Sequence, residues 1–435
     1  MSRFLHAGWL VVVLGLAGPA ELMASDERLQ QLEQRLMALE KQRQADQQRI
    51  AELEARLADS GYQSHHGSEA EREATRNMID AMLADQPTHH WGEGRPINIA
   101  AYLDFGGSLS DNDDNERHNR FNLREVEISF TGPVTSWADA AVMVALAEEI
   151  EAEDGEVEIE HHVELEEAYL NVHTLPVEGL SLRGGKFRNA FGVNNLYHTH
   201  DLPQVTRPLA VEAFLGHEGL RTVGFSARYQ WEHDLAFVAE VVNSDGGEEP
   251  VLLGDGSADN PAAVGRIVWR PGDEHATQWQ IGGSYLFGRR SEDSDLTAQL
   301  FGADLGWTGQ LPEGLGRRDY RVQAEAFWSQ VDFADADSES SFGTYVYGEV
   351  AVDPKRALGL RVDYTEFPGT GDRSAGDLDW AITPYFTWML APHFRSRLAY
   401  QHRQFETDGD WEREHNLMLQ FTIDIGAPDQ HDHDH

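Results

Sequence analysis

Histidines beside acidic residues are the most conspicuous chemical feature of this sequence. His198 and His200 are separated by one residue, Asp201 follows directly, and His217 lies further along the same segment. Imidazole together with carboxylate is a ligand combination suited to divalent transition metals such as zinc. None of these residues has the tight spacing of a structural zinc site. The segment therefore predicts either a metal site or a polar loop, and the surrounding elements must decide between them.

Two other groups of histidines raise the same question. His161 and His162 are adjacent to each other among several glutamates, and successive strand residues point to opposite faces, so only one of the two could enter a lumen. The chain ends in DQHDHDH, in which aspartate alternates with His431, His433 and His435. This tail is either solvated or a weak metal ligand.

Cationic residues just upstream of the first histidines favour a pore wall. The stretch SLRGGKFRNAFG contains Lys186 and Arg188, which share one face of an extended strand. Arg183 has the opposite parity unless Gly184 and Gly185 form a bulge. Charges inside a barrel are normal when they face water. We expect Lys186 and Arg188 to line a pore together with His198, His200, Asp201 and His217.

Composition excludes several classes of protein. The chain has 435 residues, 40% of them hydrophobic, with a formal net charge of −41 and no cysteine. The charge argues against nucleic acid as a partner. Without disulfides, an exported chain is stabilised by packing or by a closed sheet. The excess of acidic groups indicates either an electrostatic funnel for cations or an acidic, salt-adapted surface.

The first hundred residues suggest export followed by self-association. Residues 1–24 contain one short apolar run after Arg3 and predict a signal peptide. Residues 25–60 carry leucines and isoleucine at alternating three- and four-residue steps, which predicts a coiled coil that oligomerises the chain. Residues 61–96 are predicted to be a periplasmic linker.

From Ile97 onward, apolar and polar residues alternate with the period of two that is typical of β-strands. In HNLMLQFTIDI, for example, Leu417, Leu419 and Phe421 alternate with Met418 and Gln420. The predicted strands number about sixteen, at 97–106, 121–131, 137–149, 158–173, 179–191, 219–231, 235–244, 262–270, 276–289, 296–308, 319–332, 341–352, 356–367, 378–390, 394–406 and 412–425.

The connections between these strands alternate between short turns and long acidic loops. This asymmetry predicts an all-β, transmembrane, up-and-down antiparallel barrel over residues 97–426, with a polar inner face throughout and both chain ends in the periplasm. Residues 427–435 form the tail. Aromatic residues near strand ends are expected to form interfacial girdles: Tyr102, Trp137, Trp231, Trp269, Trp279, Trp307, Trp328, Tyr385 and Trp388.

Motifs for nucleophilic catalysis or phosphate binding are absent from the sequence. It contains no G-x-S-x-G elbow and no glycine-rich phosphate loop. We therefore expect neither enzymatic activity nor a cofactor.

The run LEEAYLNVHTLPVEGLSLRGGKFRNAFGVNNLYHTHDLPQVTRPLAVEAFLGHEG, residues 165–219, resembles the phosphate-selective porin (O/P-type) superfamily. It looks closest to relatives with an added N-terminal coiled coil, such as the siderophore-porin type. The resemblance implies a sixteen-stranded, trimeric barrel whose third extracellular loop, here 192–218, folds inward and narrows the pore. One departure stands out: lysine clusters carry phosphate selectivity in that family, whereas this barrel has only Lys186 and Lys355.

Three functions are consistent with these observations. The first is a passive porin of the Gram-negative outer membrane, a homotrimer embedded in lipid that passes small polar solutes. The second is uptake of zinc, iron or a metal chelate such as a siderophore, with ligands drawn from His198, His200, His217, His431, His433 and His435. The third is a structural link between the outer membrane and the periplasm.

Overall fold

The computed structural model describes residues 97–112, 119–153, 156–232, 234–244, 252–254, 260–273, 277–290, 296–311, 318–334, 338–369, 373–407 and 409–426. The predicted signal peptide, coiled coil, linker and C-terminal tail, with His431, His433 and His435, lie outside the described residues. Among the described helices, none is long and apolar enough to cross a membrane.

One antiparallel sheet makes up the described structure. Its strands are β1 (Asn98–Ser110), β2 (Arg120–Pro133), β3 (Ala138–Glu153), β4 (Glu156–Val172), β5 (Leu180–Arg188), β6 (Arg221–Trp231), β7 (Leu235–Val242), β8 (Ala262–Trp269), β9 (Gly272–Asp273), β10 (Thr277–Arg289), β11 (Thr297–Leu311), β12 (Arg318–Val331), β13 (Glu339–Asp353), β14 (Arg356–Glu366), β15 (Leu378–Ala391), β16 (Phe394–Thr407) and β17 (Asp410–Gly426).

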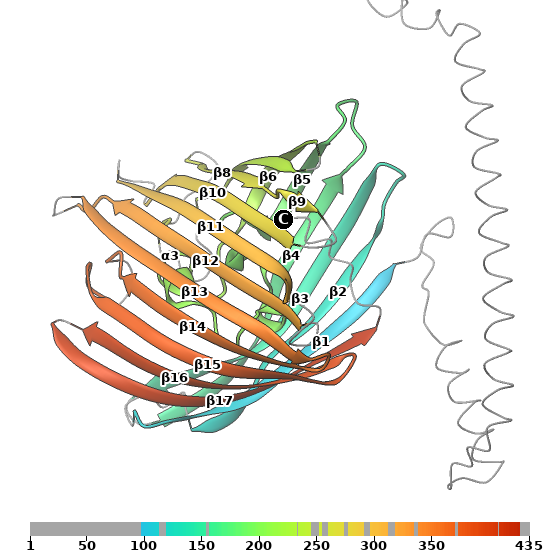
Figure 1. Ribbon diagram of the computed structural model, residues 1–435. Helices are drawn as coiled ribbons and strands as arrows, with labels where there is room; N and C mark the ends of the chain where they lie inside the picture. The colour runs from blue at the N-terminus through green and yellow to red at the C-terminus, as the bar shows by residue number, and fades with distance from the viewer. Residues whose placement is uncertain are drawn as a thin grey trace, which may run out of the picture. The chain divides into compact units, whose positions relative to one another are not determined.

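The sheet closes on itself because β1 pairs with both β2 and β17 (Figure 1). Of its seventeen strands, β9 is a two-residue segment that pairs only with the start of β10. The other sixteen form the wall, each paired with its neighbours along the chain. The prediction of about sixteen strands in an up-and-down barrel is confirmed.

The direction of the side chains is that of a barrel in lipid. On β14, Leu358, Leu360 and Val362 are exposed on the outer face, whereas Arg361 and Asp363, which have the opposite parity, are buried inside. A soluble protein would have the opposite arrangement, with apolar side chains inside and charges outside. The strand period therefore places apolar groups on the outer face and charges on the inner face, the arrangement of barrels that lie in a lipid bilayer.

Six of the nine expected girdle aromatics are exposed, Trp307 is half-buried, and two are buried. Trp231 ends β6 and Trp269 ends β8, and both are exposed next to short turns. Tyr102 and Tyr385, in contrast, are buried, on the same face as Asp104 and Thr383. The expectation that these two tyrosines belong to a girdle is wrong, because their position in the period-two pattern directs them into the lumen.

The connection between β5 and β6 folds into the barrel. It contains the short helices η1 (Asn194–Leu196), η2 (Thr199–Asp201) and α3 (Leu209–Leu215), and α3 contacts β12, β13 and β14 while η2 contacts β1. Figure 1 shows α3 inside the ring of strands. The inward-folding loop of residues 192–218, implied by the family resemblance, is therefore present.

An apolar cluster anchors the helical part of this loop. Phe214 of α3 stacks on Phe327 of β12, with ring centroids 5.8 Å apart, and Phe191 stacks on the same ring at 6.0 Å. Leu286 and Leu300 belong to the same buried cluster. The prediction of an inner face that is polar throughout is therefore wrong. The inserted loop packs an apolar core against β10–β13. Burying each of these side chains contributes about 1.5–3 kcal/mol.

The β5–β6 hairpin separates from β4 at Gly185. Pairing between β4 and β5 stops at Ala168 and Lys186, whereas pairing between β5 and β6 continues to Arg188 and Arg221. Gly185 has a φ of 137°, and a Cβ there would lie 2.1 Å from the Ala168 carbonyl oxygen. Only glycine fits this position, so the departure of the hairpin from the wall is built into the sequence.

Replacing Gly185 tests this assignment. Gly185→Ala is expected to destabilise the barrel by about 1–3 kcal/mol, since a side chain at positive φ is strained and would meet backbone atoms. The measurement is the denaturant concentration at which the detergent-embedded barrel unfolds, followed by its migration in unheated gels. Gly283→Ala is the matched control, because nothing lies within 4 Å of its added Cβ. Equal stability of the two variants would contradict the assignment.

Candidate functional site

Arginines of the barrel wall hold the carbonyl groups of the inserted loop. Arg361 on β14 donates from Nη1 to the Thr206 carbonyl at 2.6 Å. Arg397 on β16 donates to the Gln204 carbonyl at 3.2 Å, and Arg395 donates to the His200 carbonyl. A loop in a lumen has no neighbouring strand to pair with, so these guanidinium groups satisfy its acceptors.

Carboxylates of the wall hold the amide groups of the same loop. Glu325 on β12 accepts from the backbone nitrogens of Val193 and Asn194 at 3.0 and 2.7 Å. Asp363 on β14 accepts from the Leu209 nitrogen, where α3 begins, at 3.2 Å. The position of the loop is therefore fixed by charged side chains that match its donors and acceptors one by one.

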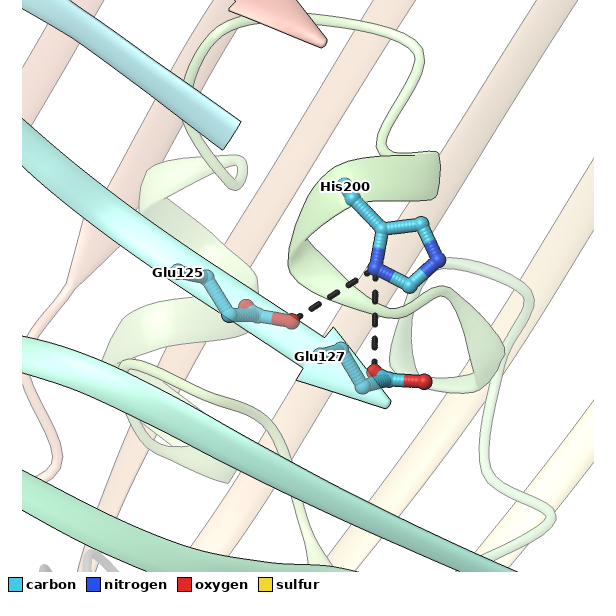
Figure 2. A group of neighbouring side chains, drawn as sticks. All are labelled: Glu125, Glu127 and His200. Atoms are coloured by element: carbon cyan, nitrogen blue, oxygen red, sulfur yellow. Dashed lines mark hydrogen bonds and ion pairs between the residues drawn. The ribbon is translucent and has the colours of Figure 1, made fainter. Parts of the chain in front are cut away.

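His198 and His200 meet the acidic inner face of the first strands. His198 Nδ1 lies 2.8 Å from Glu127 Oε2, and its Nε2 lies 3.4 Å from Glu167 Oε1. His200 Nδ1 lies 3.5 Å from Glu125 Oε1 and 3.6 Å from Glu127 Oε2. Figure 2 shows both carboxylates of β2 directed toward the His200 ring. Both imidazoles are buried.

The His200 ring is held on two further sides. Tyr102 stacks on it with ring centroids 4.0 Å apart and an angle of 10° between the planes. Asp201 Oδ2 lies 3.5 Å from His200 Nε2. The two histidine rings lie 5.6 Å apart. Both ring nitrogens of His200 therefore face carboxylates, and its plane is fixed by an aromatic neighbour.

The surrounding carboxylates favour protonation of both imidazoles. Burial opposes a charge on each ring, but Glu127 outweighs this cost at His198 and raises its pKa well above the usual value. At His200 the carboxylates of Glu125, Asp201 and Glu127 likewise outweigh burial and raise the pKa.

An ion-pair cluster fills the gap where the β5–β6 hairpin leaves β4. Arg188 Nη2 lies 2.7 Å from Glu166 Oε2, and Arg221 pairs with Glu164, Glu166 and Glu218. Lys186 Nζ lies 3.5 Å from Glu164. Each of the three cationic side chains therefore has a carboxylate partner. A buried charge without such a partner would cost several kcal/mol.

A β-bulge allows two consecutive glutamates to face this region. The pairing of β3 with β4 shifts between Met143 and Val144, which leaves Glu166 as the extra residue next to Glu167. Both glutamates are buried, and both contact Arg188 and His198. Strict alternation predicts opposite faces for these two glutamates. Their common direction therefore follows from the bulge and not from the sequence pattern of β4.

The residues predicted to line the pore do not form one cluster. His198, His200 and Asp201 lie together, and Arg188 joins them through Glu166 and Glu167. His217 is separate from these carboxylates; its side chain is 77% exposed and contacts Glu212 at 3.6 Å. His161 and His162 on β4 are both exposed.

Glu125 and Glu127 are functional candidates that the sequence interpretation missed. They share one face of β2 in REVEIS, which could have marked them as lumen residues. Nothing in the local pattern connects them with His200, because the contact joins residues 75 positions apart.

Comparison with known proteins identifies a matching family model and solved structures with a similar fold. Residues 98–303 match the family model described as phosphate-selective porin O and P. Among solved structures, the outer membrane channel DcaP of Acinetobacter baumannii matches with a TM-score of 0.55 at 12% identity, over 77% of this chain and 99% of that chain. An anion-selective porin from Comamonas acidovorans matches with a TM-score of 0.51 at 8% identity, over 76% of this chain and 100% of that chain.

A third structure, Salmonella typhi OmpF in complex with daunomycin, matches with a TM-score of 0.51 at 11% identity, over 77% of this chain and 99% of that chain. At such identities these structures show a shared fold. No curated protein matches the chain. The chain therefore has the fold of the outer-membrane porin barrels, and the match over residues 98–303 supports the phosphate-selective porin O and P family.

Proposed function

We propose that the loop of residues 192–218 is the constriction of a passive channel for small polar solutes. One observation carries this proposal: the loop lies inside a closed barrel and is bonded to wall residues on β12, β14 and β16. A segment tied to several sides of the wall narrows the lumen at a fixed place. Lys186, Arg188, His198, His200, Asp201 and His217 are the sequence-predicted residues in or next to it.

The charges near the constriction favour cations over phosphate. Lys186 and Arg188 pair with glutamates, and Arg361 and Arg397 donate to loop carbonyls. An anion would have to compete with these partners for each guanidinium or ammonium group. The net charge of −41 also attracts cations toward the pore.

Planar-bilayer recordings of the purified protein test the selectivity. In a potassium chloride gradient, we expect stable channels with a reversal potential of the sign that indicates preference for potassium. Lys186→Met is expected to leave the current carried by phosphate unchanged, because its ammonium group is already paired with Glu164. Absence of channels, or block of the chloride current by low phosphate concentrations, would contradict the proposal.

Removing two anchors tests the role of the loop. The double variant Arg361→Met and Arg397→Met leaves the carbonyls of Thr206 and Gln204 without these donors, at about 1–3 kcal/mol for each buried acceptor. We expect larger or noisier single-channel conductance, because the loop then moves within the lumen.

Arg356→Met is the control for this pair of substitutions. Arg356 is an exposed residue at a short turn, where it pairs with Asp353. Its loss is expected to leave the conductance as in the unsubstituted protein. Unchanged conductance of the double variant, with the barrel still folded, would show that residues 192–218 do not limit the current.

We also propose a homotrimer with periplasmic chain ends and a siderophore-porin-type N-terminus. The support is the heptad pattern of residues 25–60. Light scattering of the detergent-solubilised full chain is expected to give three chains per particle, and deletion of residues 26–60 to reduce that number or make it depend on concentration. A monomer in the full chain would contradict this part of the proposal.

A further inference from the structure

We propose that Glu125, Glu127 and His200 bind one divalent transition-metal ion, zinc being the probe, at the inserted loop. The proposal adds a specific ion to the channel proposed above, and rests on that function only for the ion's route to the site. Two ligands come from β2 and one from η2, so the ion would join the wall to the loop (Figure 2).

The spacing of the three ligand atoms fits a metal ion. Oxygen atoms of Glu125 and Glu127 and a nitrogen of His200 all lie within 4.8 Å of one another. His200 Nδ1 lies 3.5 and 3.6 Å from the two carboxylate oxygens. Zinc at about 2.0–2.1 Å from its ligands has tetrahedral edges of about 3.4 Å. The gap is therefore too wide for strong hydrogen bonds and close to that of two ligands sharing an ion.

The surroundings of His200 are those of a metal ligand. When Nδ1 faces the ion, Nε2 faces the Asp201 carboxylate at 3.5 Å. Metal-binding histidines commonly donate their second N–H to a carboxylate, which fixes the tautomer and the direction of the free lone pair. Stacking on Tyr102 fixes the plane of the ring.

The Glu127 carboxylate gives a second, independent indication. Its residue is 0% exposed, and among the described residues no backbone, amide or arginine N–H donates to either of its oxygens. Its contacts are ion pairs with the imidazoles of His198 and His200. Glu325 and Glu240, buried in the same lumen, both accept directed hydrogen bonds from N–H groups of the chain. Buried carboxylates are normally satisfied in that way, so Glu127 stands out.

The balance of charge also calls for a cation. Five carboxylates contact the two imidazoles: Glu125, Glu127, Glu166, Glu167 and Asp201. Of the described arginines, Arg188 contacts Glu166 and Glu167 and Arg221 contacts Glu166, whereas none pairs with Glu125 or Glu127. Buried carboxylates need nearby positive charge. A divalent ion supplies it at the point where the carboxylates of β2 converge.

The donor set selects the class of metal, and one residue beside the ligands is partly exposed. One imidazole nitrogen with two carboxylates suits first-row transition metals, whereas calcium and magnesium prefer oxygen ligands alone. Three protein ligands leave a fourth position for water. The Asp201 side chain is 34% exposed and touches His200, so the site has a polar neighbour open to solvent.

A second acidic cluster differs because an arginine already lies between its carboxylates. Glu164, Glu166 and Glu218 also bring their oxygens within 4.8 Å of one another. There the guanidinium of Arg221 already contacts all three carboxylates. No metal is proposed at that cluster, and the contrast lies in the presence or absence of an arginine between the carboxylates.

Calorimetric titration with zinc chloride tests the site. The full chain, purified in detergent and stripped with a chelator, carries His431→Ala, His433→Ala and His435→Ala so that the tail does not contribute. We expect one zinc site that is lost in His200→Ala and in Glu127→Gln. Asp201→Asn is expected to weaken it by about 10- to 100-fold, as for other outer-sphere partners. Calcium is expected to leave the zinc affinity unchanged.

His173→Ala is the matched control, because His173 pairs with a single carboxylate, Asp139, at 3.2 Å. Zinc affinity should match that of the parent chain. Absence of zinc binding in the parent chain, or equal binding in His200→Ala and Glu127→Gln, overturns the proposal. Channel recordings of the same samples separate the two failures: channels without zinc binding refute the site alone, and a parent chain without channels refutes the proposed function.

Discussion

The structure depends on one constraint: a loop inside a barrel must find partners for its backbone polar groups. No described strand pairs with residues 192–218 to form a ladder. Arginines of β14 and β16 donate hydrogen bonds to the carbonyls of His200, Gln204 and Thr206. Carboxylates of β12 and β14 accept hydrogen bonds from backbone amides near η1 and α3. An unpaired buried group costs about 1–3 kcal/mol, so these contacts determine where the loop lies.

The two halves of the loop are held by different forces. The α3 half packs Phe214 against Phe327 in an apolar cluster that needs no directed bonds. The η2 half lies among glutamates and aspartate, where distance and charge decide the contacts. Apolar packing tolerates small shifts, whereas ion pairs do not. His198 and His200, with most of the ion pairs of the loop, therefore lie in the η2 half.

The strands could be predicted from the sequence, and the site only in part. Period-two alternation is local, so every wall strand was found, and the glycine pair before Lys186 already suggested an irregularity. The burial of Tyr102 and the paired direction of Glu166 and Glu167 depend on register and on a bulge, which no single strand reveals. The contact of Glu125 with His200 depends on the path of the loop through the lumen. His217, close to His200 in sequence, contacts Glu212 instead.

The position of His200 has a consequence for the order of folding. Its ring faces Glu125 on β2, and its carbonyl accepts from Arg395 on β16, while the strands that close the barrel, β1 and β17, lie between those two. The loop thus contacts strands on both sides of the seam where β1 pairs with β17. These contacts join residues 75 and 195 positions apart, and both are in place together only when the seam is closed. His200 therefore distinguishes a finished barrel from an open sheet, since only closure brings its partners to both sides of it.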